Sequence, residues 1–108
     1  MRTDVAALIP AYNCADTIAT VVMGTAPLLA TVVVVDDGSD DETAVAAARA
    51  GAEVIRHGGN RGKGAALVTG MRHLAERGVA RVLTLDADGQ HLASEIPGLL
   101  DASDRAPA

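Results

Sequence analysis

The chain has 108 residues, a length that fits one domain spanning 1–108 rather than two. Apolar residues make up 49% of it, which excludes a disordered chain, and the formal net charge of −5 opposes binding to a nucleic-acid backbone. Phe and Trp are absent and Tyr12 is the single aromatic residue, which also argues against a base-stacking platform for single-stranded nucleic acid. The composition therefore predicts a globular domain with an aliphatic core that does not bind nucleic acid.

The chain carries few signals of a secretory or membrane destination. Cys14 is its only cysteine, so no internal disulfide can form, and we expect a reducing, cytoplasmic location. The N-terminus lacks a cleavage-site pattern, which favours a protein without a signal peptide. Residues 17–35 are uncharged, but Gly24, Pro27 and a change of period favour helix, turn and strand over a transmembrane segment.

Short β-rich runs alternate with amphipathic stretches along the sequence. Val5–Ile9 is an apolar run that Pro10 ends, which predicts a buried strand, and a helix is expected over 14–25. The β-branched run Thr31–Val35 is apolar on both faces and predicts a strand that helices cover on both sides.

A capping-box pattern follows this second strand. Ser39 and Glu42 have its spacing, so we expect Ser39 to cap a helix over 41–50. The remaining elements are a strand over 54–56, a helix over 63–77 with Leu67, Met71 and Leu74 on one face, a strand over 82–85, and a last helix capped by Ser94 that ends at Leu100 before a frayed tail.

This β-α-β-α order predicts an α/β domain with a parallel sheet of about four strands and helices on both faces. In such sheets, ligands bind at the carboxyl ends of the strands. The segments that follow the predicted strands are 10–14, 36–40, 58–62 and 86–91. We therefore expect these four segments to meet along one edge and to form the binding site.

The last of these segments has the pattern of a metal site. Asp86 and Asp88 are two positions apart just after a strand, and Gln90 adds a neutral oxygen at the same spacing. Hard cations such as Mg²⁺ or Mn²⁺ prefer oxygen ligands of this kind. The alternative is an ordinary tight turn, because Asp and Gly also favour turns.

Two further segments offer polar groups to a ligand. Asp36–Asp41 contains carboxylates that can cap a helix or accept hydrogen bonds from a ribose or a base, and Gly58–Gly64 offers backbone amides and cations to a phosphate. The alternatives are a solvated turn and a flexible loop. His57 and Gly64 rule out a P-loop, and Leu67 rules out a dinucleotide fingerprint.

The remaining reactive side chains give weak signals. We expect His57 to face solvent at a strand end, His73 to be partly exposed, and Cys14 to be a packed, inert thiol. His91 could contact a phosphate. The sequence contains no evident Ser/His/Asp or Cys/His nucleophile arrangement.

Four stretches in order resemble the family-2 glycosyltransferases, the inverting nucleotide-sugar enzymes of GT-A fold: Leu8–Asn13, Val33–Asp40, Asn60–Ala66 and Leu83–His91. The last stretch is most similar to the dolichyl- and polyprenyl-phosphate mannose or glucose synthases. The resemblance implies a Rossmann-like nucleotide-binding half that binds a GDP- or UDP-sugar with Mg²⁺ or Mn²⁺. It also implies an acceptor that is a lipid phosphate or a saccharide, and an enzyme that is cytoplasmic or peripheral at the cytoplasmic membrane face.

The resemblance also implies roles for individual residues. The nucleotide-sugar site would consist of Pro10, Tyr12, Asn13, Asp36, Asp37, Asn60, Gly62, Lys63 and Asp86. The metal ligands would be Asp86, Asp88 and Gln90. Cys14 departs from the Glu that is common at this position, and the acceptor half with its general base would lie beyond these residues.

Two alternatives remain open at this stage. The chain could be a non-catalytic nucleotide-binding fragment. It could also be a receiver-type phosphoacceptor domain, since Asp36 and Asp86 both follow strands, although the Ser/Thr and Lys strand ends of such a domain do not follow Asp86.

Overall fold

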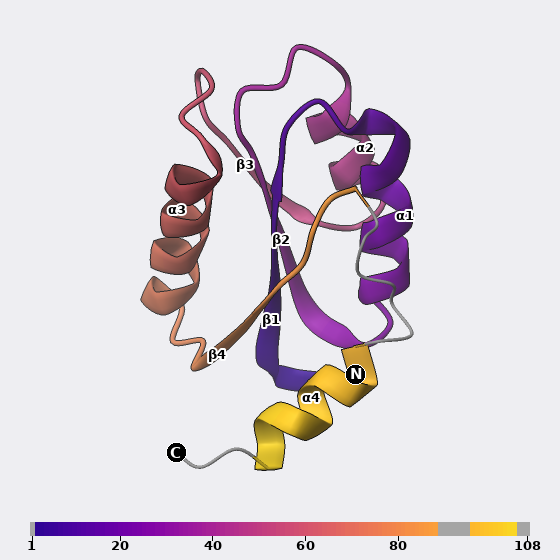
Figure 1. The fold of residues 1–108 in the computed structure, drawn as a ribbon, viewed down its shortest axis with the longest axis vertical. Helices are drawn as coiled ribbons and strands as arrows, with labels where there is room; N and C mark the ends of the chain where they lie inside the picture. The colour runs from indigo at the N-terminus through magenta and orange to yellow at the C-terminus, as the bar shows by residue number, and fades with distance from the viewer. Residues whose placement is uncertain (1, 89–95, 106–108) are drawn as a thin grey trace.

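The chain folds into one parallel sheet with helices on both faces in a computed structural model, which describes residues 2–88 and 96–105 (Figure 1). The elements in chain order are β1 (Arg2–Ala11), α1 (Ala15–Thr25), β2 (Leu29–Asp36), α2 (Thr43–Arg49), β3 (Glu53–Arg56), α3 (Lys63–Glu76), β4 (Arg81–Thr84) and α4 (Ile96–Arg105). The strand order is β3-β2-β1-β4 and every pairing is parallel. The predicted α/β fold class is thereby confirmed.

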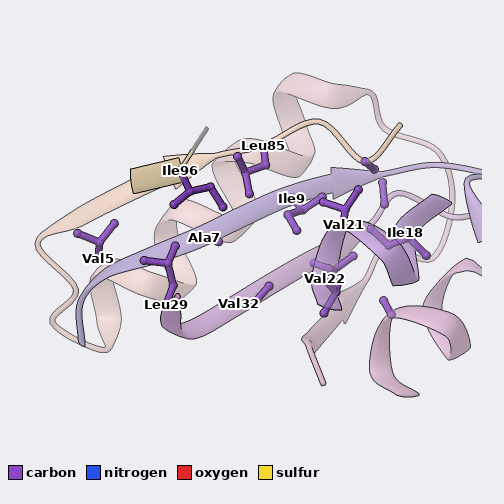
Figure 2. Packing of buried hydrophobic residues seen from close by; sticks show 14 of the residues in the cluster. Val5, Ala7, Ile9, Ile18, Val21, Val22, Leu29, Val32, Leu85 and Ile96 are labelled. Atoms are coloured by element: carbon purple, nitrogen blue, oxygen red, sulfur yellow. The ribbon is translucent and has the colours of Figure 1, made fainter. Parts of the chain in front are cut away.

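The two central strands, β1 and β2, are buried on both faces, as their continuous apolar runs predict. Their alternating side chains enter two separate hydrophobic clusters. One face packs against α1, α2 and α4 and includes residues drawn in Figure 2, among them Ala7, Ile9, Ile18, Val22 and Val32. The opposite face packs against α3 and contains Ala6, Leu8, Val33, Val35, Ala66 and Leu74.

Helix α3 packs closely against β1 at Gly70. Its buried residues are Ala66, Gly70 and Leu74, whereas Met71 is exposed, so the predicted apolar face of this helix is wrong at Met71. A Cβ atom on Gly70 would stand 2.2 Å from Cδ1 of Leu8. A side chain at this crossing would require the Leu8 side chain to shift, so Gly70 lets α3 pack closely against β1.

Strand β1 continues past Pro10, where the sequence predicted its end. The Ala11 carbonyl accepts a hydrogen bond from Asp37 N, so Ala11 faces β2. Because the backbone N–H and C=O groups of neighbouring residues in a strand point to opposite sides, the backbone of Pro10 faces the β4 side. The pairing with β4 ends at Leu8. On that side Leu85 N donates to the Leu8 carbonyl, and Pro10, which has no N–H to donate in return, ends the ladder there.

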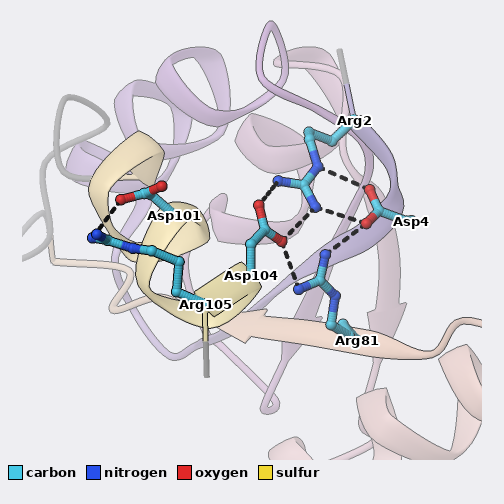
Figure 3. A network of polar contacts seen from close by, with 6 residues as sticks. All are labelled: Arg2, Asp4, Arg81, Asp101, Asp104 and Arg105. Atoms are coloured by element: carbon cyan, nitrogen blue, oxygen red, sulfur yellow. Dashed lines mark hydrogen bonds and ion pairs between the residues drawn. The ribbon is translucent and has the colours of Figure 1, made fainter. Parts of the chain in front are cut away.

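Helix α4 continues to Arg105, beyond the end at Leu100 and through the tail that was expected to fray. Figure 3 shows the network that fixes it, in which Asp104 pairs with Arg2 of β1 and Arg81 of β4, and both arginines also pair with Asp4. The predicted cap Ser94 lies outside the described residues. No helix in residues 2–88 and 96–105 is long and apolar enough to span a membrane.

Candidate functional site

A pocket of about 350 Å³ lies at the carboxyl ends of the strands. It is formed by the segments after β1, β2, β3 and β4, as the sequence predicted, although these segments are far apart along the chain. Its lining includes Pro10, Tyr12, Asp37, Asn60, Gly62, Lys63, Asp86 and Asp88, together with Ala11, Cys14, Ala66 and Ala87. The predicted metal ligand Gln90 and His91 lie outside the described residues.

Asp36 does not line this pocket and is fully buried. Its Oδ1 accepts hydrogen bonds from the amide and the hydroxyl of Ser39, and its Oδ2 lies 3.4 Å from Nε of Arg56 without a hydrogen bond. Ser39 is therefore engaged with Asp36 and is not the N-cap of α2, which begins at Thr43. The predicted capping box is wrong, and Asp36 shapes the loop behind the pocket.

Asn13 also lies outside the pocket lining and joins the loops after β1 and β2. Its backbone adopts a positive φ of 48°. Its backbone amide donates a hydrogen bond to Oγ of Ser39 at 2.8 Å, and its side-chain Oδ1 accepts one from Asp40 N at 2.9 Å. In this structure Asn13 holds one pocket loop against the other.

Asp37 is buried in the pocket wall and holds the loop after β3. Oδ1 lies 2.8 Å from Nδ1 of His57 and accepts from Arg61 N at 2.9 Å, and Oδ2 accepts from Gly62 N at 2.8 Å. Burial acts to raise the pKa of this carboxyl, but the hydrogen bonds from His57, Arg61 and Gly62 outweigh burial and leave the pKa lowered. Two amides that the sequence offered to a phosphate are thus bound to a carboxylate of the chain.

His57 is buried, so the expectation that it faces solvent is wrong. Its Nδ1 meets Asp37, and its Nε2 lies 2.8 Å from Oγ1 of Thr69 in α3. Sequence reasoning missed this residue because Thr69 of α3 meets it only in the folded chain. The available signal was Thr69, a polar residue on the helix after the glycine-rich loop that could serve as a hydrogen-bond partner for a buried histidine.

Lys63 and two aspartates form the charged side of the pocket. Nζ of Lys63 lies 3.2 Å from Oδ1 of Asp86, so an ammonium group already stands beside the carboxylate predicted to hold a cation. Among the described residues no group of three or more His, Cys, Asp or Glu side chains could hold a metal. Asp86 and Asp88 fit a Mg²⁺ or Mn²⁺ ion that takes its other oxygens from water and a ligand's phosphates.

The other predicted pocket residues differ in exposure. Tyr12 is 47% exposed and lies at the rim. Cys14 is partly buried, and its amide donates to Oγ1 of Thr43. Burial, with the charges of Asp41 and Asp36, raises the pKa of the Cys14 thiol against the opposing hydrogen bonds of Tyr12 and Thr43. The thiol is therefore poorly suited to act as a nucleophile, as the sequence suggested.

Comparison with known proteins adds a family and a fold. Residues 6–108 match the family described as Glycosyl transferase family 2. An uncharacterized protein of Methanocaldococcus jannaschii is 45% identical over 65 residues, which are 60% of this chain and 27% of that protein.

Two solved structures are similar over nearly the whole chain. Mannosyl-3-phosphoglycerate synthase from Rubrobacter xylanophilus is 32% identical with a TM-score of 0.76, over 97% of this chain and 37% of that one. Glucosyl-3-phosphoglycerate synthase from Mycobacterium tuberculosis, in complex with Mn²⁺, UDP and glucosyl-3-phosphoglycerate, is 28% identical with a TM-score of 0.75, over 94% and 39%. The chain thus spans less than half the length of these relatives, and its sheet has their Rossmann-like GT-A fold.

Proposed function

Because the chain belongs to glycosyl transferase family 2, we propose that its pocket binds the donor of a sugar transfer, a nucleotide-diphosphate sugar, together with Mg²⁺ or Mn²⁺. One observation carries this proposal. The pocket brings together groups suited to a base, to a diphosphate and to a divalent cation, from segments after four different strands. Because the family match covers residues 6–108, it also argues against the alternative of a receiver-type phosphoacceptor domain.

The pocket has two chemically different sides. Pro10 and Tyr12 supply apolar surface for the base, and Asp37 and Gly62 lie in the wall formed by the next two loops. Asn60 lies in the same lining, which supports a contact between its side chain and the nucleotide. The nucleotide would lie across the ends of β1 and β2.

The charged side suits the diphosphate. Asp86 and Asp88 alone would repel it, whereas a bound divalent cation reverses the local charge and stabilises the negative charge that develops on the leaving diphosphate. Lys63 adds a second positive charge beside Asp86. Gln90 completes the proposed set of metal ligands.

The names of the similar solved structures favour a uridine donor and a phosphate-bearing acceptor. Structures of the Mycobacterium tuberculosis glucosyl-3-phosphoglycerate synthase hold UDP with Mn²⁺ or with Mg²⁺, and one holds UDP-glucose with Mn²⁺ and phosphoglyceric acid. We infer an acceptor that carries a phosphate, since phosphoglycerate and polyprenyl phosphate share this group. Membrane contact would accompany only the lipid acceptor, and inversion at the anomeric carbon is a prediction from the family resemblance alone. Transfer assays with both acceptors, on a form of the protein that also contains an acceptor-binding half, followed by NMR of the product anomer, test these points.

Calorimetry on the folded chain tests donor binding. We expect UDP or GDP to bind in the presence of Mn²⁺, and the Asp88→Ala variant to lose at least about tenfold in affinity, because one metal ligand is removed. Asp101→Ala is the matched control, since Asp101 is an exposed carboxylate on α4 that pairs with Arg105. No heat with either nucleotide, or an equal loss in both variants, would contradict the proposal.

A further inference from the structure

His57 joins three elements behind the pocket. It follows β3, its Nδ1 lies 2.8 Å from Oδ1 of Asp37 after β2, and its Nε2 lies 2.8 Å from Oγ1 of Thr69 in α3. The side chains of His57 and Asp37 are each 5% exposed. Neither His57 nor Thr69 lines the pocket, whereas Asp37 does.

The chemistry of the partners fixes the direction of these hydrogen bonds. An ionised carboxylate can only accept, so Nδ1 of His57 carries a proton and donates it to Asp37. In the neutral ring, Nε2 then accepts from the hydroxyl of Thr69. The chain of donors runs from Thr69 through His57 to Asp37, and both ring nitrogens are satisfied.

Asp37 passes this constraint to the loop after β3. The same carboxylate accepts from the amides of Arg61 and Gly62, and Gly62 is the residue before α3. The next residue, Lys63, contributes its positively charged side chain to the pocket lining. The orientation of the Asp37 carboxylate therefore determines where the amide of Gly62 and the first turn of α3 lie.

We propose that His57 is a positioning residue for the nucleotide site, which acts by donating a hydrogen bond from Nδ1 to Asp37 and so fixes the loop at 61–62. The proposal rests on the proposed function for its effect on binding, but the hydrogen bond itself can be tested without a nucleotide. A hydrophobic side chain of similar volume could fill the same space, but it would leave a buried carboxylate one donor short.

Two variants with a side-chain amide at position 57 separate the effect of the hydrogen-bond donor from the effect of side-chain volume. The side-chain NH₂ of His57→Asn lies near the position of Nδ1 and can donate to Asp37, whereas that of His57→Gln lies near the position of Nε2 and reaches toward Thr69. We expect His57→Asn to keep the affinity for UDP or GDP with Mn²⁺ within about threefold of the wild type. We expect His57→Gln to lose about tenfold, the effect of losing one charge-assisted hydrogen bond.

Amide hydrogen exchange gives a readout that needs no ligand. We expect faster exchange at Arg61 and Gly62 in His57→Gln, wild-type protection at both in His57→Asn, and unchanged protection in β1 and β2 in both variants. Equal exchange at Arg61 and Gly62 in the two variants would overturn the proposal and leave His57 as a packing residue. If the wild type bound neither nucleotide, the proposed function would fail, while the exchange comparison would still decide the role of His57.

The wild-type protein provides a test that does not depend on the folding of a variant. Nitrogen-15 NMR of the histidine ring should show a proton on Nδ1 of His57 and a hydrogen bond at that proton. A neutral ring protonated only at Nε2 would overturn the proposal, because such a ring has nothing to donate to Asp37.

Discussion

Gly38 lies directly against the backbone of Gly59, so the loop after β2 rests on the loop after β3. A Cβ atom on Gly38 would stand 2.5 Å from the carbonyl carbon of Gly59 and 2.7 Å from Asn60 N. Gly38 also has a φ of 76°, in the left-handed region. The contact places two of the four pocket segments at a fixed separation.

The Gly38→Ala variant should therefore lose stability for two reasons, backbone strain and the clash with Gly59. We expect a loss of at least about 2 kcal/mol in the free energy of unfolding by urea. Gly78→Ala is the control, since Gly78 has nearly the same φ of 77° but nothing within 4 Å of its added Cβ. Strain alone predicts about 1 kcal/mol there. Equal losses in the two variants would show that the Gly59 contact has no energetic weight.

A second glycine pair tests the close approach of α3 to β1. Gly70→Ala should destabilise the fold by about 1–3 kcal/mol, because the new methyl group would overlap Leu8 in a packed core. Gly64→Ala in the same helix meets nothing within 4 Å and should stabilise it by up to about 1 kcal/mol through helix propensity. Thermal unfolding of both variants decides the matter. A stabilised Gly70→Ala would mean that α3 can move away from the sheet without cost.

Asp37 should make stability depend on pH in the acid range. Its pKa in the folded chain is below the ordinary value of 3.8, so its ionised form stabilises the fold. The contribution is present above that value and is lost as the pH falls through the lower, folded pKa. The advantage of the wild type over Asp37→Asn should thus be full at pH 7 and should shrink below about pH 4.

Urea unfolding of both proteins at pH 7, 4 and 3 measures this difference. Asp4, Asp41 and Asp104 also have lowered pKa values, but they are present in both proteins and cancel in the comparison. A difference between the two proteins that stays constant across this range would mean that the charge of Asp37 does not stabilise the fold.

Lys63 should have opposite effects on the metal and on the nucleotide. Its ammonium group competes with a cation for Asp86, so Lys63→Met should bind Mn²⁺ alone more tightly, by about threefold to tenfold. The same variant should bind UDP or GDP with Mn²⁺ more weakly, because a positive charge near the diphosphate is lost. Calorimetry measures both affinities.

Arg61→Met is the control for net charge. Arg61 neighbours Gly62 in the loop but is not part of the pocket lining, so its loss removes one positive charge without emptying the place beside Asp86. If both variants shifted Mn²⁺ affinity equally, the change would reflect overall charge, and the competition at Asp86 would be refuted.

The strands and the pocket segments were predictable because their signals are local. The run Thr31–Val35 lies within β2, and Asp86 follows β4 at the expected edge of the sheet. A continuous apolar run needs cover on both faces wherever it occurs in a parallel sheet. The position of the pocket at the carboxyl ends of the strands followed from this topology.

The side-chain partners were not predictable, because they come from distant segments. Ser39 has the spacing of a helix cap, yet its hydroxyl bonds Asp36 and accepts from Asn13, 26 positions earlier in the sequence. His57 follows a short edge strand and becomes buried only when Thr69 and Asp37 close around it. Propensities describe what each residue can do, and the tertiary contacts decide which of these options is used.

Asp37 also gives the pocket an electrical polarity. Its carboxylate accepts hydrogen bonds from the two backbone amides that a phosphate-binding loop would offer to its ligand, so an anion of the chain itself occupies that place. A diphosphate would be repelled from that wall and drawn toward Lys63 and a cation at Asp86 and Asp88. For the proposed donor, the charge of this one buried carboxylate would thus determine the orientation in the pocket. The base would lie against the wall that contains Asp37, and the diphosphate would lie on the opposite side.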